Sequence, residues 1–430
     1  MLLTDLEILT MVPGSSPTRG AIRIDGERLA EIGALEPKPN EEVRSCSGWT
    51  ALPGFVQGHV HLCQTLFRNL AEDLPLLDWL HERVWPLEAA HDEASLRASA
   101  RLALFEMVSG GCTTFQSMET VHGTEFAFDE VAQSGLRAVV GNTLMDGSDV
   151  PTGLKQTTAE ALATAAALHD DWHGHKGRIF HALCPRFILS CTRELMGELG
   201  RLRAEEGRRV HTHAAEHPDE VLAIKTACGK RNLLALAELD LLGPETSLAH
   251  CVHLDDEEQA ALSASGAAVL HCPSTNLKLG SGIAPVRRYL DAGVPVAIGA
   301  DGAPANNRLD VLTELRQAAL LQQWHSGPGT LSAFDALSLA TREGARALGF
   351  GEVCGTLEPG KAADLVLMDL NDPRLGPGGD PYTKIVYAAD RSHIRDVMVA
   401  GRFLDRGLDA EGVAHDAGLA LKGVLSRSGL

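Results

Sequence analysis

The chain has 430 residues, of which 44% are hydrophobic, and a formal net charge of −19. That length accommodates one large barrel with a smaller domain, or two or three ordinary domains. It contains no run of 18 uncharged apolar residues, which argues against a membrane span, and its acidity argues against a nucleic-acid polymer as partner. The start, MLLTDLEILT, lacks a basic signal-peptide region, and the nine cysteines include no CxxC pair. We therefore expect a cytoplasmic protein with reduced thiols.

Both ends of the chain have β character. Within residues 1–50, the short apolar runs LEIL, AIRI and LAEIG surround the turn sequence DGE. From Gly355 onward, the runs ADLVLMDL, KIVYAA and DVMVAGRFL again favour strands. Because these segments flank the middle of the chain, we predict a small β-sandwich built from residues 1–50 and 355–430.

The middle of the chain, residues 51–354, alternates strand-like runs with amphipathic stretches. Eight runs are typical of strands: GFVQGHVHL, CTTFQSM, LRAVVGNTL, RIFHALC, RRVHTHA, TSLAHC, AAVLHC and VPVAIGA. Apolar residues recur at helical spacing in stretches between and after them, at 92–109, 158–171, 193–206, 255–264 and 309–323. Eight strand–helix units favour an α/β fold of the (β/α)8 TIM-like barrel type over a doubly wound sheet, which has about six strands.

Four side chains of the kind that bind metals fall at the ends of predicted strands. His59 and His61 are two residues apart in the first strand, so both point to the same face. His213 ends the fifth strand and Asp301 follows the eighth. Because a barrel's active site lies at the C-terminal strand ends, these four side chains would meet there. Three neutral nitrogens and one anion leave a coordination position open for water, as in catalytic metal sites.

Two further side chains are candidates for proton transfer beside such a metal. Glu216 follows His213 by three residues, where a carboxyl group could carry a proton during hydrolysis of a C–N bond. The sixth strand ends in His250, with His253 three residues later. We favour His250 because it lies on the strand itself, which leaves His253 as a loop histidine.

Together these residues resemble the amidohydrolase superfamily, and in particular its one-metal aminohydrolases. The resemblance runs over nearly the whole chain and includes PGFV, LAHCVHL, HCPSTNLKLGSGIAPV, GADGAPANNRLD and GTLEPGKAADLVLMD. It implies that the four metal-binding side chains hold one divalent ion, zinc first and iron second. It also implies that Glu216 is the proton shuttle, that His250 orients the attacking water, and that Asp301 takes a proton from it. Two-metal members carry a carboxylated lysine on the fourth strand; RIFHALC has none, so one metal is expected.

One part of the resemblance points to guanine deaminases. The segments DLPLLDWL, WPLE and CPRFILSC carry it, and it implies that Arg186, Phe187 and Gln64 contact the purine. A guanidinium donates to ring acceptors, an aromatic ring stacks on the heterocycle, and a carboxamide offers both a donor and an acceptor. The expected activity is therefore metal-dependent hydrolytic deamination of guanine or a related purine or pterin, with release of ammonia. The structural alternatives are a salt bridge for Arg186 and a core position for Phe187.

Another part of the resemblance departs from guanine deaminases. GADGAPANNRLDVLTELRQAALLQ resembles deaminases of S-adenosylhomocysteine and methylthioadenosine, and s-triazine chlorohydrolases and aminohydrolases. A non-catalytic metal-binding scaffold is a more remote alternative, against which the complete set of ligands and shuttle argues. We expect a small heterocyclic substrate and a homo-oligomer, in particular a dimer. The sequence leaves several roles open: Trp85, Glu88, His253, His271, Asn276, Asn306 and Asn307.

Overall fold

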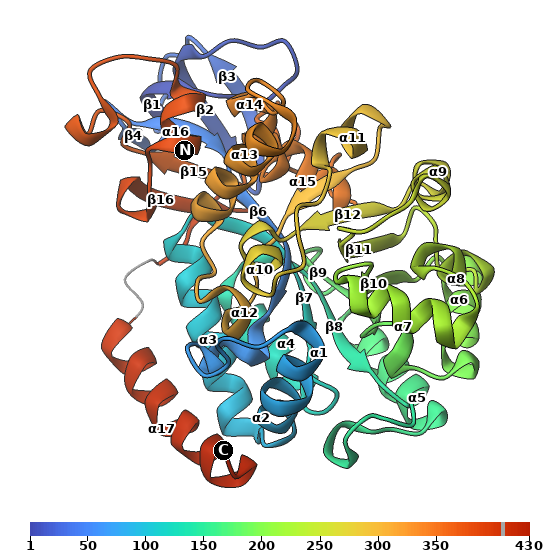
Figure 1. Ribbon diagram of the computed structural model, residues 1–430. Coiled ribbons are helices and arrows are strands. Elements are labelled where there is room, and N and C mark those ends of the chain that lie inside the picture. Colours follow the sequence, from blue (N-terminus) through green and yellow to red (C-terminus); the bar gives the residue numbers. More distant parts are fainter. Residues whose placement is uncertain (406–408) are drawn as a thin grey trace.

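The computed structural model describes residues 1–405 and 409–430. Two parts are evident in Figure 1: a helix-covered barrel, and a sheet made by both ends of the chain. This arrangement confirms the predicted fold class, a (β/α)8 TIM-like barrel with a β domain built from both chain ends. The strands of that domain belong to one sheet, whereas a sandwich was expected.

The barrel consists of parallel strands in chain order, with the eighth strand split in two. The strands are β6 (Phe55–His61), β7 (Cys112–Glu119), β8 (Arg137–Leu144), β9 (Ile179–Pro185), β10 (Arg209–Ala214), β11 (Thr246–His250), β12 (Ala268–His271), β13 (Val296–Ile298) and β14 (Asp301–Gly302). β13 pairs with β12, and β14 pairs with β6. The eighth strand therefore closes the ring.

At the interruption of the eighth strand, the chain lies tightly against the first strand. A Cβ atom on Gly299 would lie 2.9 Å from the backbone nitrogen of His59, so only glycine fits there. The next residue, Ala300, donates its N–H to the Gln57 side chain at 3.0 Å. The strand then resumes at Asp301, whose φ of 63° is left-handed. This local geometry places Asp301 beside the first strand.

The helices that surround the barrel follow the predicted amphipathic stretches closely. The predicted ones are α3 (Glu93–Ser109), α5 (Thr158–Trp172), α6 (Arg193–Glu206), α9 (Asp256–Ser265) and α13 (Val311–Ser326). The others are α4 (Thr124–Ser134), α7 (Pro218–Cys228), α8 (Asn232–Glu238), α10 (Pro273–Lys278), α11 (Val286–Asp291), α12 (Ala303–Asn306), α14 (Ala333–Leu339) and α15 (Arg342–Ala347). Asp92, Thr157 and Asp255 each start a helix with a capping box.

A chain of short helical elements follows the first strand and leads to α3. These are η1 (Leu62–Phe67), α1 (Leu76–Trp79), η2 (Leu80–Val84) and α2 (Trp85–Ala89). η2 is a π-helical turn, a conformation that is rare and concentrated at functional sites. Short 3-10 turns also occur at η3 (Thr152–Leu154), η4 (Ile188–Ser190), η5 (Pro373–Leu375) and η6 (Arg391–His393).

The terminal sheet joins the two chain ends through the pairing of β5 with β15. Its N-terminal strands are β1 (Leu2–Ile8), β2 (Thr18–Asp25), β3 (Arg28–Gly33), β4 (Val43–Ser45) and β5 (Thr50–Pro53). Its C-terminal strands are β15 (Leu365–Met368), β16 (Ile394–Val399) and β17 (Arg402–Phe403). Leu3, Leu6 and Ile8 share one buried cluster with Leu365 and Leu367. Burial of these side chains favours the association of the two ends.

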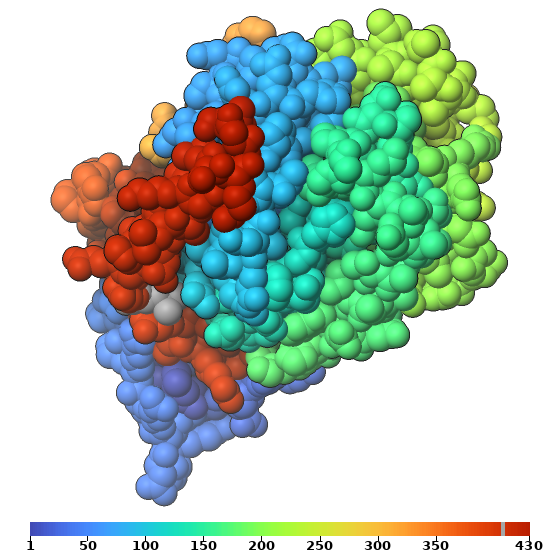
Figure 2. Space-filling view, turned by 90° about the horizontal axis from the view of Figure 1, so that it is seen from below, coloured from blue at the N-terminus to red at the C-terminus, as the bar shows by residue number. Residues whose placement is uncertain are grey.

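Two segments near the C-terminus are helical where β structure was expected. KIVYAA was predicted as a strand, but its first four residues complete α16 (Pro381–Tyr387), because Asp380 caps a helix that begins with Pro381. The segment α17 (Ala410–Ser428) lies within the predicted range 355–430 of the β domain, yet it packs against the barrel helix α3. Figure 2 shows α17, in red, lying along the blue segment that contains α2 and α3. The domain boundaries otherwise remain predictions.

Within the described part of the chain, no helix is long and apolar enough to cross a membrane. All nine cysteines are free thiols, and only Cys228 is exposed.

Candidate functional site

The four predicted metal-binding side chains meet at one place. His59 and His61 come from β6, His213 from β10 and Asp301 from the start of β14. One potential ligand atom from each lies within 4.8 Å of the others. These positions are the C-terminal ends of the first, fifth and eighth strands, where a barrel carries its active site. The structure therefore brings together the whole predicted ligand set.

Each of the three imidazoles has its Nδ1 atom bound to a neighbour outside the cluster. The partner of His59 Nδ1 is the Nε2 atom of His211, at 2.8 Å. His61 Nδ1 donates to the carbonyl oxygen of Met118, and His213 Nδ1 to that of Arg186, each at 2.7 Å. Such bonds fix the tautomer and leave Nε2 free for a metal. His211 is 152 positions from His59 in the sequence, so local spacing could not show that His211 supports this ligand.

Asp301 supplies the negative charge of the cluster. Its Oδ1 atom lies 3.2 Å from the Nε2 atoms of both His59 and His61. Burial acts to raise the pKa of Asp301, but the interaction with these two imidazoles outweighs burial and holds the pKa well below its usual range. Asp301 is therefore ionised, as a carboxylate ligand must be.

This donor set fits a divalent cation. The Nε2 atom of His59 is buried and has no hydrogen-bond partner among the described residues. Burial lowers the pKa of His59 to about 4 and that of His213 well below the usual range, so both rings are neutral near pH 7. Neutral imidazoles with one carboxylate suit zinc or iron.

Glu216 and His250 lie on the open side of the cluster. The Nε2 atom of His250 is 3.4 Å from Glu216 Oε2 and 4.0 Å from Asp301 Oδ2. His250 Nδ1 bonds Asn276 Oδ1 at 2.9 Å, which orients the ring toward these carboxyl groups. His253 instead bonds the carbonyl oxygen of Ser281 at 2.5 Å. The geometry thus places His250, and not His253, beside the metal-binding side chains.

The surroundings of Glu216 favour its protonated form. Burial, with the charges of Asp301 and Glu220, raises the pKa of Glu216 well above its usual range. The backbone N–H of Glu216 donates to Glu220 Oε2 at 2.7 Å, and Asn232 donates to Glu220 Oε1 at 2.6 Å. Glu220 therefore anchors the turn that carries Glu216. The sequence signal for Glu220 is a capping box at the start of α7, which alone indicates only a helix start.

The predicted substrate residues share one buried partner. Gln64 Nε2 donates to Glu88 Oε1 at 2.7 Å, and Arg186 Nη1 donates to Glu88 Oε2 at 2.8 Å. The Arg186 and Glu88 side chains are only 4% and 1% exposed. Arg186 therefore forms the ion pair that was its structural alternative, while its side chain also lines the cavity described next. Phe187 belongs to a buried apolar cluster with Trp85 and likewise lines the cavity.

A small cavity lies over the metal-binding side chains and has a free volume of about 30 Å³. Its lining comprises His61, Gln64, Leu76, Trp79, Leu80, Arg186, Phe187, His213, Glu216, Glu220, His250, Leu279 and Asp301. That volume suits a single water, so a heterocyclic substrate requires the outer wall to move. The outer wall is formed by α1, by the start of η2 and by Leu279.

Two of the remaining candidates, Asn306 and Asn307, have structural partners. Asn306 donates to the carbonyl oxygen of Ala300 and to Glu314. Asn307 donates to Asn69 and Glu72, which connects α12 to the loop after η1. Neither caps α13, because Asp310 does so. His271 is fully buried and is not part of the cavity lining, and its ring nitrogens have no partner among the described residues.

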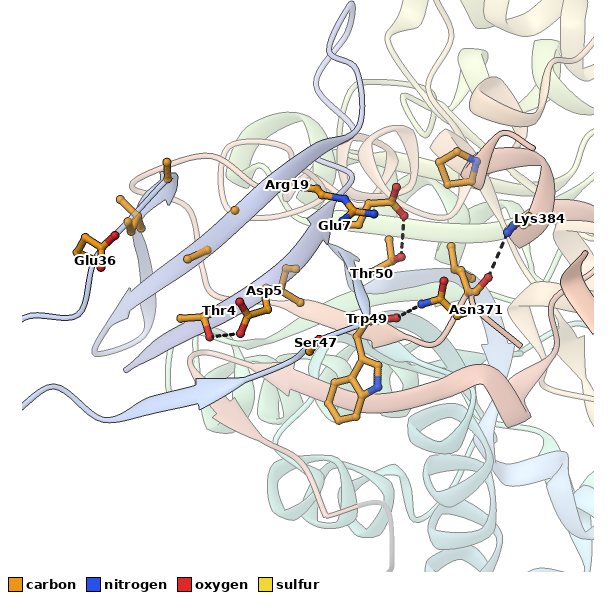
Figure 3. A pocket seen from close by; sticks show the side chains of 18 of the residues that line it. Thr4, Asp5, Glu7, Arg19, Glu36, Ser47, Trp49, Thr50, Asn371 and Lys384 are labelled. Carbon is orange, nitrogen blue, oxygen red and sulfur yellow. Dashed lines mark hydrogen bonds between the residues drawn. The ribbon is translucent and has the colours of Figure 1, made fainter. Parts of the chain in front are cut away.

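A larger hollow, of about 670 Å³, lies on the terminal sheet (Figure 3). Several of its polar side chains bond one another or the backbone: Glu7 accepts from Thr50, and Asn371 donates to the carbonyl oxygen of Gly48. None of the described metal-binding clusters lies there. The chemistry therefore belongs to the smaller cavity in the barrel.

A parallel barrel that presents imidazole and carboxylate side chains at its C-terminal strand ends is typical of hydrolases that activate water. The model of the Amidohydrolase family matches residues 50–404. The chain belongs to this family, and it is a hydrolase that acts on C–N bonds.

Similar proteins cover almost the full chain. A 5-methylthioadenosine/S-adenosylhomocysteine deaminase of Moorella thermoacetica is 40% identical over 94% of this chain and 95% of its own length. A 5'-deoxyadenosine deaminase of Methanothermobacter thermautotrophicus is 36% identical over 96% and 94%. The crystal structure of an adenosine deaminase from Xanthomonas campestris with bound zinc is 30% identical, covers 99% of both chains and has a TM-score of 0.92.

Guanine deaminase of E. coli is a more distant structural neighbour. It is 27% identical, covers 94% of this chain and 98% of its own, and has a TM-score of 0.85. Triazine hydrolase from Arthrobacter, at 24% identity and a TM-score of 0.91, shares the fold.

Proposed function

We propose that this protein is a metal-dependent nucleoside deaminase that hydrolyses the exocyclic amino group of an adenine nucleoside. The observation that carries the reaction type is the position of Glu216, a buried acid beside His250 and Asp301. The adenine nucleoside class is supported by the relatives of 40% and 36% identity that cover nearly the whole chain. We therefore place adenine nucleosides ahead of guanine, which was the first expectation from the sequence.

The reassignment agrees with the contacts of the residues expected to read guanine. Gln64 and Arg186 both donate to Glu88, so part of their donor capacity is already used within the protein. Guanine presents a ring carbonyl that needs donors, whereas the adenine ring of a nucleoside presents only nitrogen acceptors and its amino group. An adenine ring therefore needs fewer hydrogen-bond donors from Gln64 and Arg186 than guanine does.

His59, His61, His213 and Asp301 would hold the metal, for which we propose zinc. When bound, the ion supplies Lewis acidity that makes water nucleophilic near neutral pH. Asp301 Oδ2, which faces His250, accepts a proton from the attacking water, and His250 orients that water. Glu216 donates its proton to the ring nitrogen next to the carbon under attack. The C–O bond forms as a water proton passes to Asp301. That proton then joins the amino group, the C–N bond breaks and ammonia leaves, while the proton of the new hydroxyl returns to Glu216 and a ring carbonyl remains.

Ammonia release and the ultraviolet spectrum test this proposal with the zinc-loaded enzyme. The substrates are adenosine, 5-methylthioadenosine, 5′-deoxyadenosine, guanine and a chlorotriazine. We expect ammonia from the adenine nucleosides and loss of activity on chelation, with recovery when zinc is returned. Deamination of guanine alone, or release of chloride without ammonia, would overturn the proposal.

A further inference from the structure

The cavity has two chemically different ends. The inner end is formed by the metal-binding side chains with Glu216 and His250, and the outer end by Leu76, Trp79, Leu80, Phe187 and Leu279. If the proposed function holds, the reacting carbon of the adenine ring lies at the inner end. The sugar and its 5′ substituent then extend toward the outer end, and the outer wall selects among 5′ groups.

Positive charge in the cavity lining is already compensated. Arg186 is the one lysine or arginine among the described lining residues, and it pairs with Glu88 at 2.8 Å. Next to the wall residue Leu279, Lys278 pairs with Glu72 at 2.7 Å and also bonds Asn307. A carboxylate entering the outer end would therefore meet no free cation among these residues.

The carboxyl groups of the lining do not supply the missing cation. Glu216, Glu220 and Asp301 all contribute carboxyl groups to the cavity. An ionised group brought into a buried apolar site without a partner loses its hydration and gains nothing in return.

Besides His250 Nε2 at the inner end, two buried polar side-chain atoms of the described lining residues lack a hydrogen-bond partner. Trp79 Nε1 and Gln64 Oε1 are buried and have no hydrogen-bond partner among the described residues. One is a donor and the other an acceptor, so together they suit uncharged groups such as hydroxyls. Buried polar groups are normally paired, which indicates that substrate completes these two.

We propose that the site takes adenine nucleosides with an uncharged 5′ substituent, such as hydrogen or methylthio, and discriminates against the ionised amino-acid tail of S-adenosylhomocysteine. This inference rests on the proposed function. It adds that Trp79 determines affinity by donating a hydrogen bond to the neutral part of the substrate.

The test compares kcat/KM of the zinc-loaded enzyme for 5′-deoxyadenosine, 5-methylthioadenosine and S-adenosylhomocysteine. A fourth substrate, the butylthio analogue, matches the tail length without its amino and carboxyl groups and separates charge from size. We expect S-adenosylhomocysteine to be about 100-fold poorer than the butylthio analogue, since unpaired buried polar groups give strong rejection. Equal rates for these two would overturn the inference. If no adenine nucleoside is deaminated, the proposed function itself fails.

Substitutions at the outer wall provide a second readout. Leu279→Arg adds a cation, and it should raise the relative rate of S-adenosylhomocysteine about tenfold or more, as a charge-assisted contact allows. Leu279→Met is the matched neutral control and should leave the ratio unchanged. Trp79→Phe keeps an aromatic ring without its N–H, and should raise KM about tenfold with kcat and zinc content unchanged. An unchanged KM in this variant would contradict the role of Trp79.

Discussion

The two ends of the catalytic cavity differ in how their side chains are held. At the metal end, the imidazoles come from barrel strands, and each Nδ1 atom bonds a neighbour in the barrel. At the substrate end, Gln64 and Glu88 come from short helical elements, and Trp79 and Leu279 close the cavity without polar partners of their own. The proposed chemistry thus rests on barrel strands, whereas the proposed selectivity rests on short helical elements and loops. Four substitutions test this division.

Glu216→Gln removes the proposed proton donor and should have the largest effect. We expect kcat to fall about 10³-fold, within the range for loss of a general acid. Zinc content, measured by atomic emission, should stay at one ion per chain because Glu216 is outside the ligand set. Normal turnover in this variant would contradict the proton-transfer role.

Glu88→Gln changes the substrate end of the cavity and leaves the metal-binding side chains unchanged. It leaves the buried Arg186 guanidinium without its charge partner, so we expect the free energy of unfolding to fall by about 3 kcal/mol. KM for nucleosides should rise while zinc affinity stays the same. The double variant Glu88→Leu with Arg186→Leu removes both charges and should recover much of the stability in denaturant titrations. Weakened zinc binding in Glu88→Gln would show that the two ends are coupled.

His211→Leu tests the support of the metal end. The loss of its hydrogen bond to His59 Nδ1 should weaken zinc binding about 10- to 100-fold, as for other outer partners of metal ligands. Competition with a chelator measures this directly, without any assay of turnover. His211→Gln retains a polar partner and should be affected less. Equal zinc affinity in the leucine and glutamine variants would argue against this support role.

Glu220→Gln should have the smallest effect of the four substitutions, a shift in the pH profile of turnover. Glu216 donates only when protonated, so turnover is kept below its raised pKa and is lost as pH rises through that pKa. Because the charge of Glu220 helps to raise this pKa, its removal should move the alkaline fall to lower pH, by roughly half a unit. The amide can still accept from the N–H of Glu216, which keeps the turn in place. An alkaline limb that does not move would exclude this electrostatic role.

Much of the architecture could be predicted because it depends on local patterns. Strand-like runs and helical spacing located the barrel, and strand ends located His59, His61, His213 and Asp301. The prediction of a strand at KIVYAA was wrong. Its β-branched residues favour a strand, but the Asp380 cap before it stabilises a helix. Similarly, nothing local shows where the face of α17 that contains Ala417 and Val424 is buried.

The supporting contacts of the site could not be predicted, because they join residues that are distant in the chain. Glu88 meets Arg186 from 98 positions away, and Asn276 meets His250 from 26. A sequence shows that such side chains are polar, but not which partner each will have. The first preference, guanine, required Gln64 and Arg186 to be free donors, but both donate to Glu88.

The pairing of β5 with β15 has a consequence for how the protein is made. Roughly 300 residues separate these two strands, and a ribosome that adds about 5–20 residues per second needs on the order of 15–60 s to pass from one to the other. During that interval, β5 is an apolar strand without its antiparallel neighbour, which is the kind of edge that chaperones protect and aggregates recruit. The terminal sheet can therefore be completed only after the barrel between its two halves has been synthesised. A chain that ends early keeps the exposed edge of β5.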